Sequence, residues 1–402
     1  MNKQTIIDNN ARIDALTKRV NQSGVGYMDM LQARVDSNNS CYYLFYKYNG
    51  TNVDFLENLD TSNVTDMTCM FYDCTNLITI PKLDMSKTTK VASMFKNCIA
   101  LTSIPQLNTS SLTSTYYMFD GCSVLTTIPQ LDTGNVTETT AMFSGCSALT
   151  EIPQLDTSKV TIMSKMFNNC SNLTTIPLLD TSSCTDMKQM FYYCSKLTSI
   201  PQFDTSSCTD LAGFVQGCSS LTEFPQLDTS SCTTMSSFFD RCSLLTEIPQ
   251  LDTRNVTAMG YMFENCSALT EIPQLDMRNV TSTTSMFKNC TNLTNLTLKN
   301  IKVSLQIGSG TSYGTKLTDE SLINTAKELW DKTGSTSQKL TMATASKTAI
   351  QSIYVKLVDV TDEMIANDEY ISNKKPCVVC ESTDDGAMTL QEYIISKNWS
   401  IA

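Results

Sequence analysis

Ten cysteines recur at a constant interval of 24 residues, and such a ladder could form disulfides or bind a metal. If the repeats stack about 5 Å apart, neighbouring cysteines come within disulfide distance. Free cysteine, however, is among the most buried residue types, and Cys184, Cys208 and Cys232 stand where other repeats carry valine. We therefore expect buried free thiols, a pattern that suits assembly in a reducing compartment. The ten cysteines are Cys74, Cys98, Cys122, Cys146, Cys170, Cys194, Cys218, Cys242, Cys266 and Cys290.

A second cysteine pattern, Cys377-Val-Val-Cys380, has the spacing of a redox pair or of half a zinc site. A zinc site needs two further ligands. The chain has no histidine and no second pair of this spacing to supply them. We interpret Cys377 and Cys380 as structural or incidental cysteines.

An aspartate also recurs at the 24-residue interval, and a row of carboxylates could bind calcium. The Asp-Thr-Ser sequence around it is equally typical of an Asx turn, in which the side-chain oxygen accepts backbone N–H groups. Asn108 replaces the aspartate in one repeat, and asparagine makes that turn without adding a ligand charge. Turn capping is therefore the favoured interpretation. The aspartates are Asp60, Asp84, Asp132, Asp156, Asp180, Asp204, Asp228, Asp252 and Asp276.

The overall composition excludes several function classes. The absence of histidine removes the usual general base and the commonest metal ligand. A net charge of −11 disfavours nucleic acid and anionic membrane surfaces, which bind through Lys and Arg. No apolar run is long enough to span a bilayer. We expect a protein without enzymatic activity, cofactor or metal.

The residues that vary between repeats are the best candidates for a binding surface. Four glutamates precede the repeated Ile/Phe-Pro pair, and several tyrosines have an exposed pattern. Acidic groups beside aromatic rings can bind sugars or a basic partner, although an ordinary solvated face would carry the same residue types. The candidates are Glu151, Glu223, Glu247, Glu271, Tyr116, Tyr117, Tyr192, Tyr193 and Tyr261.

The element that must position these residues is one coil per 24-residue unit. Unbroken self-similarity at a period of 20–29 residues is typical of leucine-rich repeats. Leu149, Ile152 and Leu155 predict a short extended strand, which leads through the Asp-Thr-Ser turn to Val160. The spacing of Met163, Met166 and Phe167 then predicts a single helical turn, and the pair before each cysteine a tight turn. The ten coils of residues 59–300 should stack as a solenoid, because a lone coil buries too little to fold.

The N-terminal segment predicts self-association. Ile6, Ile13 and Val20 recur every seven residues, and Leu16 occupies an inner position, as in a short heptad seam. An ordinary amphipathic attachment helix is an equal alternative. We assign residues 1–40 to an attachment or oligomerisation helix, and residues 41–58 to an N-terminal cap in which 41–50 form a strand.

The repeat "LDTSNVTDMTCMFYDCTNLITIP", residues 59–81, resembles the BspA-like leucine-rich-repeat family, whose "surface protein" repeats are also grouped with the Mycoplasma lipoprotein-associated repeat DUF285. The resemblance covers residues 59–300 and implies extracellular binding, adhesion and protein interaction without catalysis. Residues 317–402 resemble the tail that follows such repeats in many phage and gut-bacterial proteins. That tail implies helix, strand, helix and a final strand, here interrupted at about 350–388. We therefore assign 301–402 to a small α+β cap.

Surface-type repeats without a visible leader favour a bacteriophage head-fibre, tail-fibre or decoration protein. Virions assemble in the cytoplasm, so a fibre needs no export signal and keeps its thiols reduced. In this hypothesis the chain is a homo-oligomer, with a trimer favoured. Its N-terminus binds other virion proteins, and its solenoid binds a bacterial surface glycan or protein. The alternative is a bacterial or protist cell-surface adhesin.

Overall fold

Successive repeats stack in parallel, with one backbone bridge per coil. The structure is a computed structural model that describes residues 26–306, 317–318, 321, 338–341, 354–358, 377–381, 388–389 and 399–401. It divides into two units, Met1–Cys208 and Thr209–Ala402. The parallel bridges of unit 1 join Ser40, Asp66, Lys90, Ser114, Glu138, Ile162 and Asp186, and those of unit 2 join Asp210, Thr234, Ala258 and Ser282. The predicted repeat solenoid is therefore present in each unit.

The segment before each cysteine forms three overlapping tight turns. In the first full repeat, hydrogen bonds run from Met70 N to Met67 O (3.1 Å) and from Tyr72 N to Cys69 O (3.2 Å). Cys69 and Asp73 adopt left-handed backbone conformations, with φ of 55° and 59°. These two residues break the helical path, and their N–H groups donate to carbonyls of the next coil.

The helical turn predicted at Met163, Met166 and Phe167 is therefore wrong. Lys165 and Asn169 both have φ of 58°. Phe167 N donates to a carbonyl of the next coil, Met190 O, at 3.0 Å instead of to its own coil. Stacking satisfies more backbone groups here than a single isolated helical turn would, and it overrides the local apolar spacing. The turn predicted at the pair before the cysteine is confirmed.

The Ile-Pro side of the coils in unit 1 is not a regular strand, contrary to the prediction for Leu149, Ile152 and Leu155. Proline lacks the N–H that a strand ladder needs. The side chain of the glutamine that follows the proline replaces that ladder. For example, Gln130 Nε2 donates to Gln154 O (2.7 Å) and to Leu131 O (3.1 Å). The three predicted apolar residues are nevertheless buried.

The core between the two sides is a column of rings and thiols. In unit 1, Phe45 and its equivalents up to Phe191 stack in near-parallel fashion, with adjacent centroids 5.4–5.8 Å apart. Each repeated thiol donates to a carbonyl of the preceding coil, as Cys146 Sγ does to Phe119 O at 3.2 Å. All 15 cysteines of residues 26–306 are free and buried, which confirms the buried-thiol prediction.

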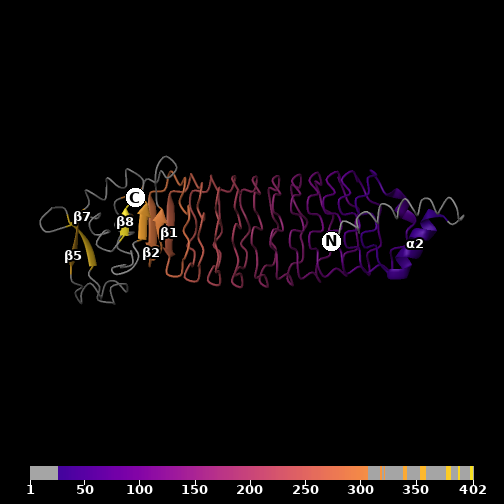
Figure 1. The fold of residues 1–402 in the computed structure, drawn as a ribbon, viewed down its shortest axis with the longest axis horizontal. Coiled ribbons are helices and arrows are strands. Elements are labelled where there is room, and N and C mark those ends of the chain that lie inside the picture. Colours follow the sequence, from indigo (N-terminus) through magenta and orange to yellow (C-terminus); the bar gives the residue numbers. More distant parts are fainter. Residues whose placement is uncertain are drawn as a thin grey trace. The chain divides into compact units, whose positions relative to one another are not determined.

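The first coil of unit 1 is covered by α2 (Tyr27–Asn38), at the indigo end of the ribbon (Figure 1). Leu31 and Val35 are buried. Gln32 mimics a neighbouring strand, because its Nε2 donates to Asp60 O (3.0 Å) and its Oε1 accepts from Asp60 N (2.8 Å). A 3-10 helix, η1 (Asp54–Asn58), follows.

The strand expected at 41–50 is wrong: this stretch forms the same overlapping turns as the repeats, with left-handed Tyr43 and Lys47, because its N–H groups donate to the next coil. The heptad residues Ile6, Ile13, Leu16 and Val20 lie outside the described residues, and their role stays a prediction.

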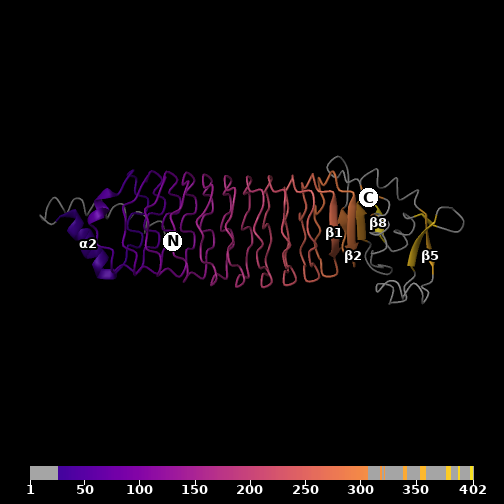
Figure 2. The same cartoon turned by 180° about the vertical axis from the view of Figure 1, so that it is seen from behind.

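Unit 2 contains the regular strands. β1 (Glu271–Asp276) and β2 (Asn295–Lys299) pair in parallel and lie side by side from both directions (Figures 1 and 2). Thr297 stands in β2 where earlier coils have proline, so this coil keeps its backbone donor. The register shifts between Ile272 and Leu275, around Pro273.

The tail adds two three-stranded sheets. A parallel sheet joins β3 (Leu305–Gln306), β4 (Gln338–Thr341) and β8 (Trp399–Ile401). An antiparallel sheet has β5 (Tyr354–Val358) between β6 (Cys377–Glu381) and β7 (Met388–Thr389). The second sheet falls in the stretch that interrupts the family-like tail; the tail's expected helices lie almost wholly outside the described residues. Among those residues, no helix has the length and apolar character required to cross a bilayer.

Candidate binding groove

A groove of about 1230 Å³ runs along the Pro-Gln-Leu-Asp-Thr-Ser side of unit 1. Its wall carries a glutamine amide and an aspartate carboxylate in most coils, and a serine hydroxyl in two of them. Leu178, 62% exposed, replaces the glutamine in one coil. The lining includes Gln106, Gln130, Gln154, Leu178, Gln202, Asp132, Asp156, Asp180, Asp204, Ser158 and Ser182.

Hydrogen bonds between coils hold the groove's backbone rigid. Thr157 Oγ1 donates to Asp180 O at 2.7 Å, and Thr181 Oγ1 donates to Asp204 O at 2.7 Å. Both threonines are buried, so these bonds are shielded from water. The glutamine three residues before Thr157 forms a similar bond between coils, as Gln130 does at the same repeat position. Side chains thus fix the coil spacing where proline has removed the backbone ladder.

The groove carboxylates cap Asx turns, as predicted. Asp156 Oδ1 accepts from Ser158 N at 3.1 Å and from Ser158 Oγ at 2.7 Å. These bonds lower the pKa of Asp156, the serine hydroxyl first and the backbone N–H second, and the same pattern lowers the pKa of Asp180 and Asp204. The carboxylates of these three residues are therefore ionised at neutral pH. In residues 26–306 no cluster of three or more acidic or cysteine side chains has metal-binding geometry.

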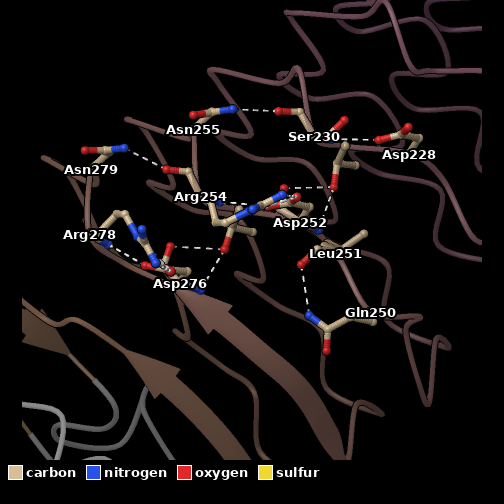
Figure 3. Close-up of polar contacts among 12 residues, drawn as sticks. Asp228, Ser230, Gln250, Leu251, Asp252, Arg254, Asn255, Asp276, Arg278 and Asn279 are labelled. Carbon is tan, nitrogen blue, oxygen red and sulfur yellow. Dashed lines mark hydrogen bonds and ion pairs between the residues drawn. The ribbon is translucent and has the colours of Figure 1, made fainter. Parts of the chain in front are cut away.

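In unit 2 two of the equivalent aspartates, Asp252 and Asp276, form ion pairs with arginine. Arg254 and Arg278 stand in the serine position and fold back onto Asp252 and Asp276, with Nη2 to Oδ2 distances of 2.6 Å in both pairs (Figure 3). Asn279 Nδ2 also donates to Arg254 O at 2.7 Å. Asp156 and Asp180 in unit 1 are thus capped by serine, whereas Asp252 and Asp276 in unit 2 are held in ion pairs.

The predicted tyrosines occupy different places. Tyr116 is 40% exposed and packs edge-on against Tyr117, with centroids 4.4 Å apart. Tyr192 and Tyr193 form a second pair at 4.6 Å, but at the other end of the turn segment. Tyr261, in unit 2, is 43% exposed. None of the five lines the groove.

The predicted glutamates are all exposed: Glu151 in unit 1, and Glu223, Glu247 and Glu271 in unit 2. The last three occupy the same repeat position in consecutive coils. Glu151 does not line the groove. A role for these residues in binding remains a prediction.

The repeated glutamine was missed by sequence reasoning. The sequence does show a recurring Pro-Gln pair. The glutamine matters because it replaces the hydrogen bond that the proline N–H would make, and that bond is needed only when coils stack. Tyr42, Tyr43 and Tyr46 were also missed, because the first coil departs from the repeat.

The groove's chemistry suits binding. It offers hydrogen-bond donors, acceptors and negative charge, and the chain has no histidine to act as a base. The buried thiols are poor nucleophiles: desolvation raises the pKa of Cys184 and of Cys232 to about 11. Ordered carboxylates and amides attract hydroxyl groups and cations.

Comparisons with solved structures return leucine-rich-repeat proteins with low scores. A leucine-rich cell surface protein from Faecalibacterium prausnitzii is 22% identical with a TM-score of 0.38, over 69% of this chain and 85% of that one. A leucine-rich-repeat protein from Bacteroides ovatus is 17% identical at 0.33, over 72% and 79%. The leucine-rich-repeat protein of T. pallidum is 19% identical at 0.29, over 45% and 70%. Scores this low carry no information on ligand or location.

A search of curated proteins finds no match. A family model described as "Mycoplasma protein of unknown function, DUF285" matches residues 39–151, 143–227 and 209–312. These matches span the repeats of both units and more than half of the 402 residues. They agree with the resemblance of the individual repeat, and the chain therefore belongs to the DUF285 family of BspA-like repeat proteins.

Proposed function

We propose that this chain is a non-enzymatic binding protein of the bacterial cell surface, and that the groove of unit 1 contacts its ligand. The observation that carries the proposal is the repetition along the groove. Asp132, Asp156, Asp180 and Asp204 line it at the same position of successive coils. An extended ligand would meet a carboxylate at each of these four coils, with a glutamine amide beside it in all but the Leu178 coil.

The cell-surface setting has more support than the virion setting. The family model is named for a cellular organism, and its repeats resemble those of BspA-like surface proteins. The phage head- or tail-fibre hypothesis depended on the absence of a visible leader, and neither the family nor the described fold adds support to it.

The groove favours a ligand rich in hydroxyl groups or positive charge. The carboxylates of Asp156, Asp180 and Asp204 are ionised at neutral pH, since hydrogen bonds from Ser158, Ser182 and Ser206 lower their pKa. The net charge of the chain, −11, has the same sign. A bacterial or host surface glycan, or a basic protein surface, fits this chemistry.

The test is binding of the fluorescently labelled full chain to intact bacterial and epithelial cells by flow cytometry. We expect the triple variant Asp132→Asn, Asp156→Asn and Asp180→Asn to bind at least ten-fold less while keeping its fold and a cooperative melting transition. The turn survives the change, because Asn108 Oδ1 accepts from Ser110 N at 3.2 Å in the native chain. The matched control is Asp60→Asn, the same turn outside the groove.

Two results would contradict the proposal: no binding to any cell, or equal binding by the triple variant. Enzymatic activity has its own test. Reproducible hydrolysis of a cell-surface glycan, abolished by changing Glu223, Glu247 or Glu271, would overturn the non-enzymatic assignment.

Self-association through the N-terminus is a separate part of the proposal. Deleting residues 1–22 should lower the mass per particle in light scattering, from a trimer in the favoured case. An unchanged mass would refute it.

A further inference from the structure

A second surface of unit 1, on the turn segments of its first four coils, carries two pairs of tyrosines. Tyr42 and Tyr43 belong to the first coil, and Tyr116 and Tyr117 occupy the same two positions three coils later. Backbone hydrogen bonds set this register step by step: Tyr43 N to Thr68 O (3.1 Å), Cys69 N to Ala92 O (2.9 Å), Ser93 N to Tyr116 O (2.8 Å). The intervening coils carry only small side chains there: Thr68, Cys69, Ala92 and Ser93. We call these eight residues the tyrosine-flanked strip.

Each tyrosine pair is held in place by its neighbours. The rings of Tyr42 and Tyr43 pack edge-on at 4.5 Å, and those of Tyr116 and Tyr117 at 4.4 Å. The Tyr43 hydroxyl is hydrogen-bonded with the Cys69 thiol. The outer ring of each pair stays open to solvent, 48% for Tyr42 and 40% for Tyr116. Rigid, partly exposed rings lose little entropy on binding.

Polar groups flank the strip on the side of the following turn. Lys96 Nζ lies 2.8 Å from Asp120 Oδ2 and 4.1 Å from the centroid of the Tyr117 ring. Asn97 Nδ2 donates to Asp73 Oδ1 at 2.8 Å. These interactions fix a cation, two carboxylates and an amide beside the aromatic faces.

The charges select the ligand class. An anion would meet Asp66, Asp73 and Asp120. A cation would find the carboxylates of Asp120 and Asp73 already paired, with Lys96 at 2.8 Å and with Lys47 at 4.0 Å. An apolar partner would leave the Lys–Asp pair without compensation for its lost water. A neutral sugar has C–H faces for the open rings and hydroxyls for the fixed polar groups.

We infer that the tyrosine-flanked strip is a binding site for a neutral oligosaccharide, distinct from the groove. Three coils separate the tyrosine pairs, about 14 Å at the spacing of paired strands. One ring therefore stacks on each end of a short chain of pyranose units, and the small residues between leave room for its middle. Lys96, Asp120 and Asn97 bind hydroxyls along one edge.

The test uses the full chain and an array of neutral oligosaccharides of three to six sugars, with sialylated and sulfated counterparts, followed by calorimetry on the best neutral probe. Tyr42→Ala and Tyr116→Ala are each expected to weaken binding at least ten-fold. Tyr42→Phe and Tyr116→Phe keep the ring and should stay within about three-fold. Tyr261→Ala, an exposed tyrosine of unit 2, is the matched control and should bind as the native chain does.

The inference is overturned if no neutral oligosaccharide binds, if only charged ones bind, or if the alanine variants bind normally. Melting temperatures identify any alanine variant that has lost its fold. The phenylalanine variant at that position then provides the test: if it loses binding while it stays folded, ring stacking is refuted. The result is separable from the groove, because the triple aspartate variant should bind the neutral probe normally while losing cell binding.

Discussion

Replacing one ring of the phenylalanine column tests the stacking argument most directly. Phe143 is fully buried, and its ring lies parallel to those of Phe119 and Phe167, each with its centroid 5.8 Å away. Phe143→Ala opens a cavity in a column that cannot collapse along its axis, because inter-coil hydrogen bonds fix the coil spacing. Such changes cost about 3–5 kcal/mol. Two ring contacts, each worth about 0.5–1.5 kcal/mol beyond burial, place the expected loss in the upper half of that range.

The assay is urea unfolding of the full chain followed by far-UV circular dichroism. We expect a lower midpoint for Phe143→Ala, and Tyr261→Ala as a surface control should stay within about 0.5 kcal/mol of the native chain. A second readout is local. Cys170 Sγ donates to Phe143 O at 3.1 Å, so Cys170 and Cys146 should react with a thiol reagent sooner than distant cysteines in the variant. A loss below about 1 kcal/mol, with uniform thiol reactivity, would refute a column whose coils depend on their neighbours.

Three further predictions concern the side-chain ladder, the turns and the thiols. Gln130→Ala removes two hydrogen bonds and should cost about 1–3 kcal/mol at about 0.5–1.5 each, measured by urea midpoint; an unchanged midpoint would mean that the amide does not replace the strand ladder. Because the folded pKa of Asp156 lies below its unfolded value, its contribution to stability is present above pH 4 and is lost as the pH falls through the folded pKa. Melting followed from pH 7 to pH 2 should therefore show less acid sensitivity in Asp156→Asn, and an identical pH profile would contradict that. The 15 cysteines of residues 26–306 should resist alkylation at pH 8 in the native chain and react together in urea, since burial raises thiol pKa, to about 11 for Cys184; rapid native labelling of several of them would refute their burial.

Repeat spacing predicted the stacked coil, the buried cysteines and the Asx turns. Each of these depends on residue type alone: cysteine tolerates full burial, and aspartate followed by Thr-Ser caps its own turn wherever the chain bends. The resemblance of one unit, residues 59–81, also identified the family. These inferences are well supported because the same pattern recurs in many coils.

Local conformation within the coil was predicted less well. The spacing of Met163, Met166 and Phe167 fits a helical turn, yet Lys165 and Asn169 are left-handed. The apolar positions are the same in both conformations, so periodicity does not distinguish them. The proposed binding surfaces were predicted only in part: Tyr116 and Tyr117 were candidates, but Tyr42 and Tyr43 joined them only through the register of four coils.

The sequence by itself determined the period, the family, the buried column and the acidic character of the chain, because these follow from residue type and spacing. The tertiary structure decided where the backbone hydrogen bonds go. In a coil with the repeated proline, that proline lacks a backbone N–H donor, and the left-handed residues direct other N–H groups toward the next coil. The coil therefore satisfies its polar groups through that next coil, and Gln130 and its equivalents replace the missing proline N–H. That choice between intra-coil and inter-coil partners depends on the presence of a neighbour 24 residues away, and it also sets which side chains line the groove and the tyrosine-flanked strip.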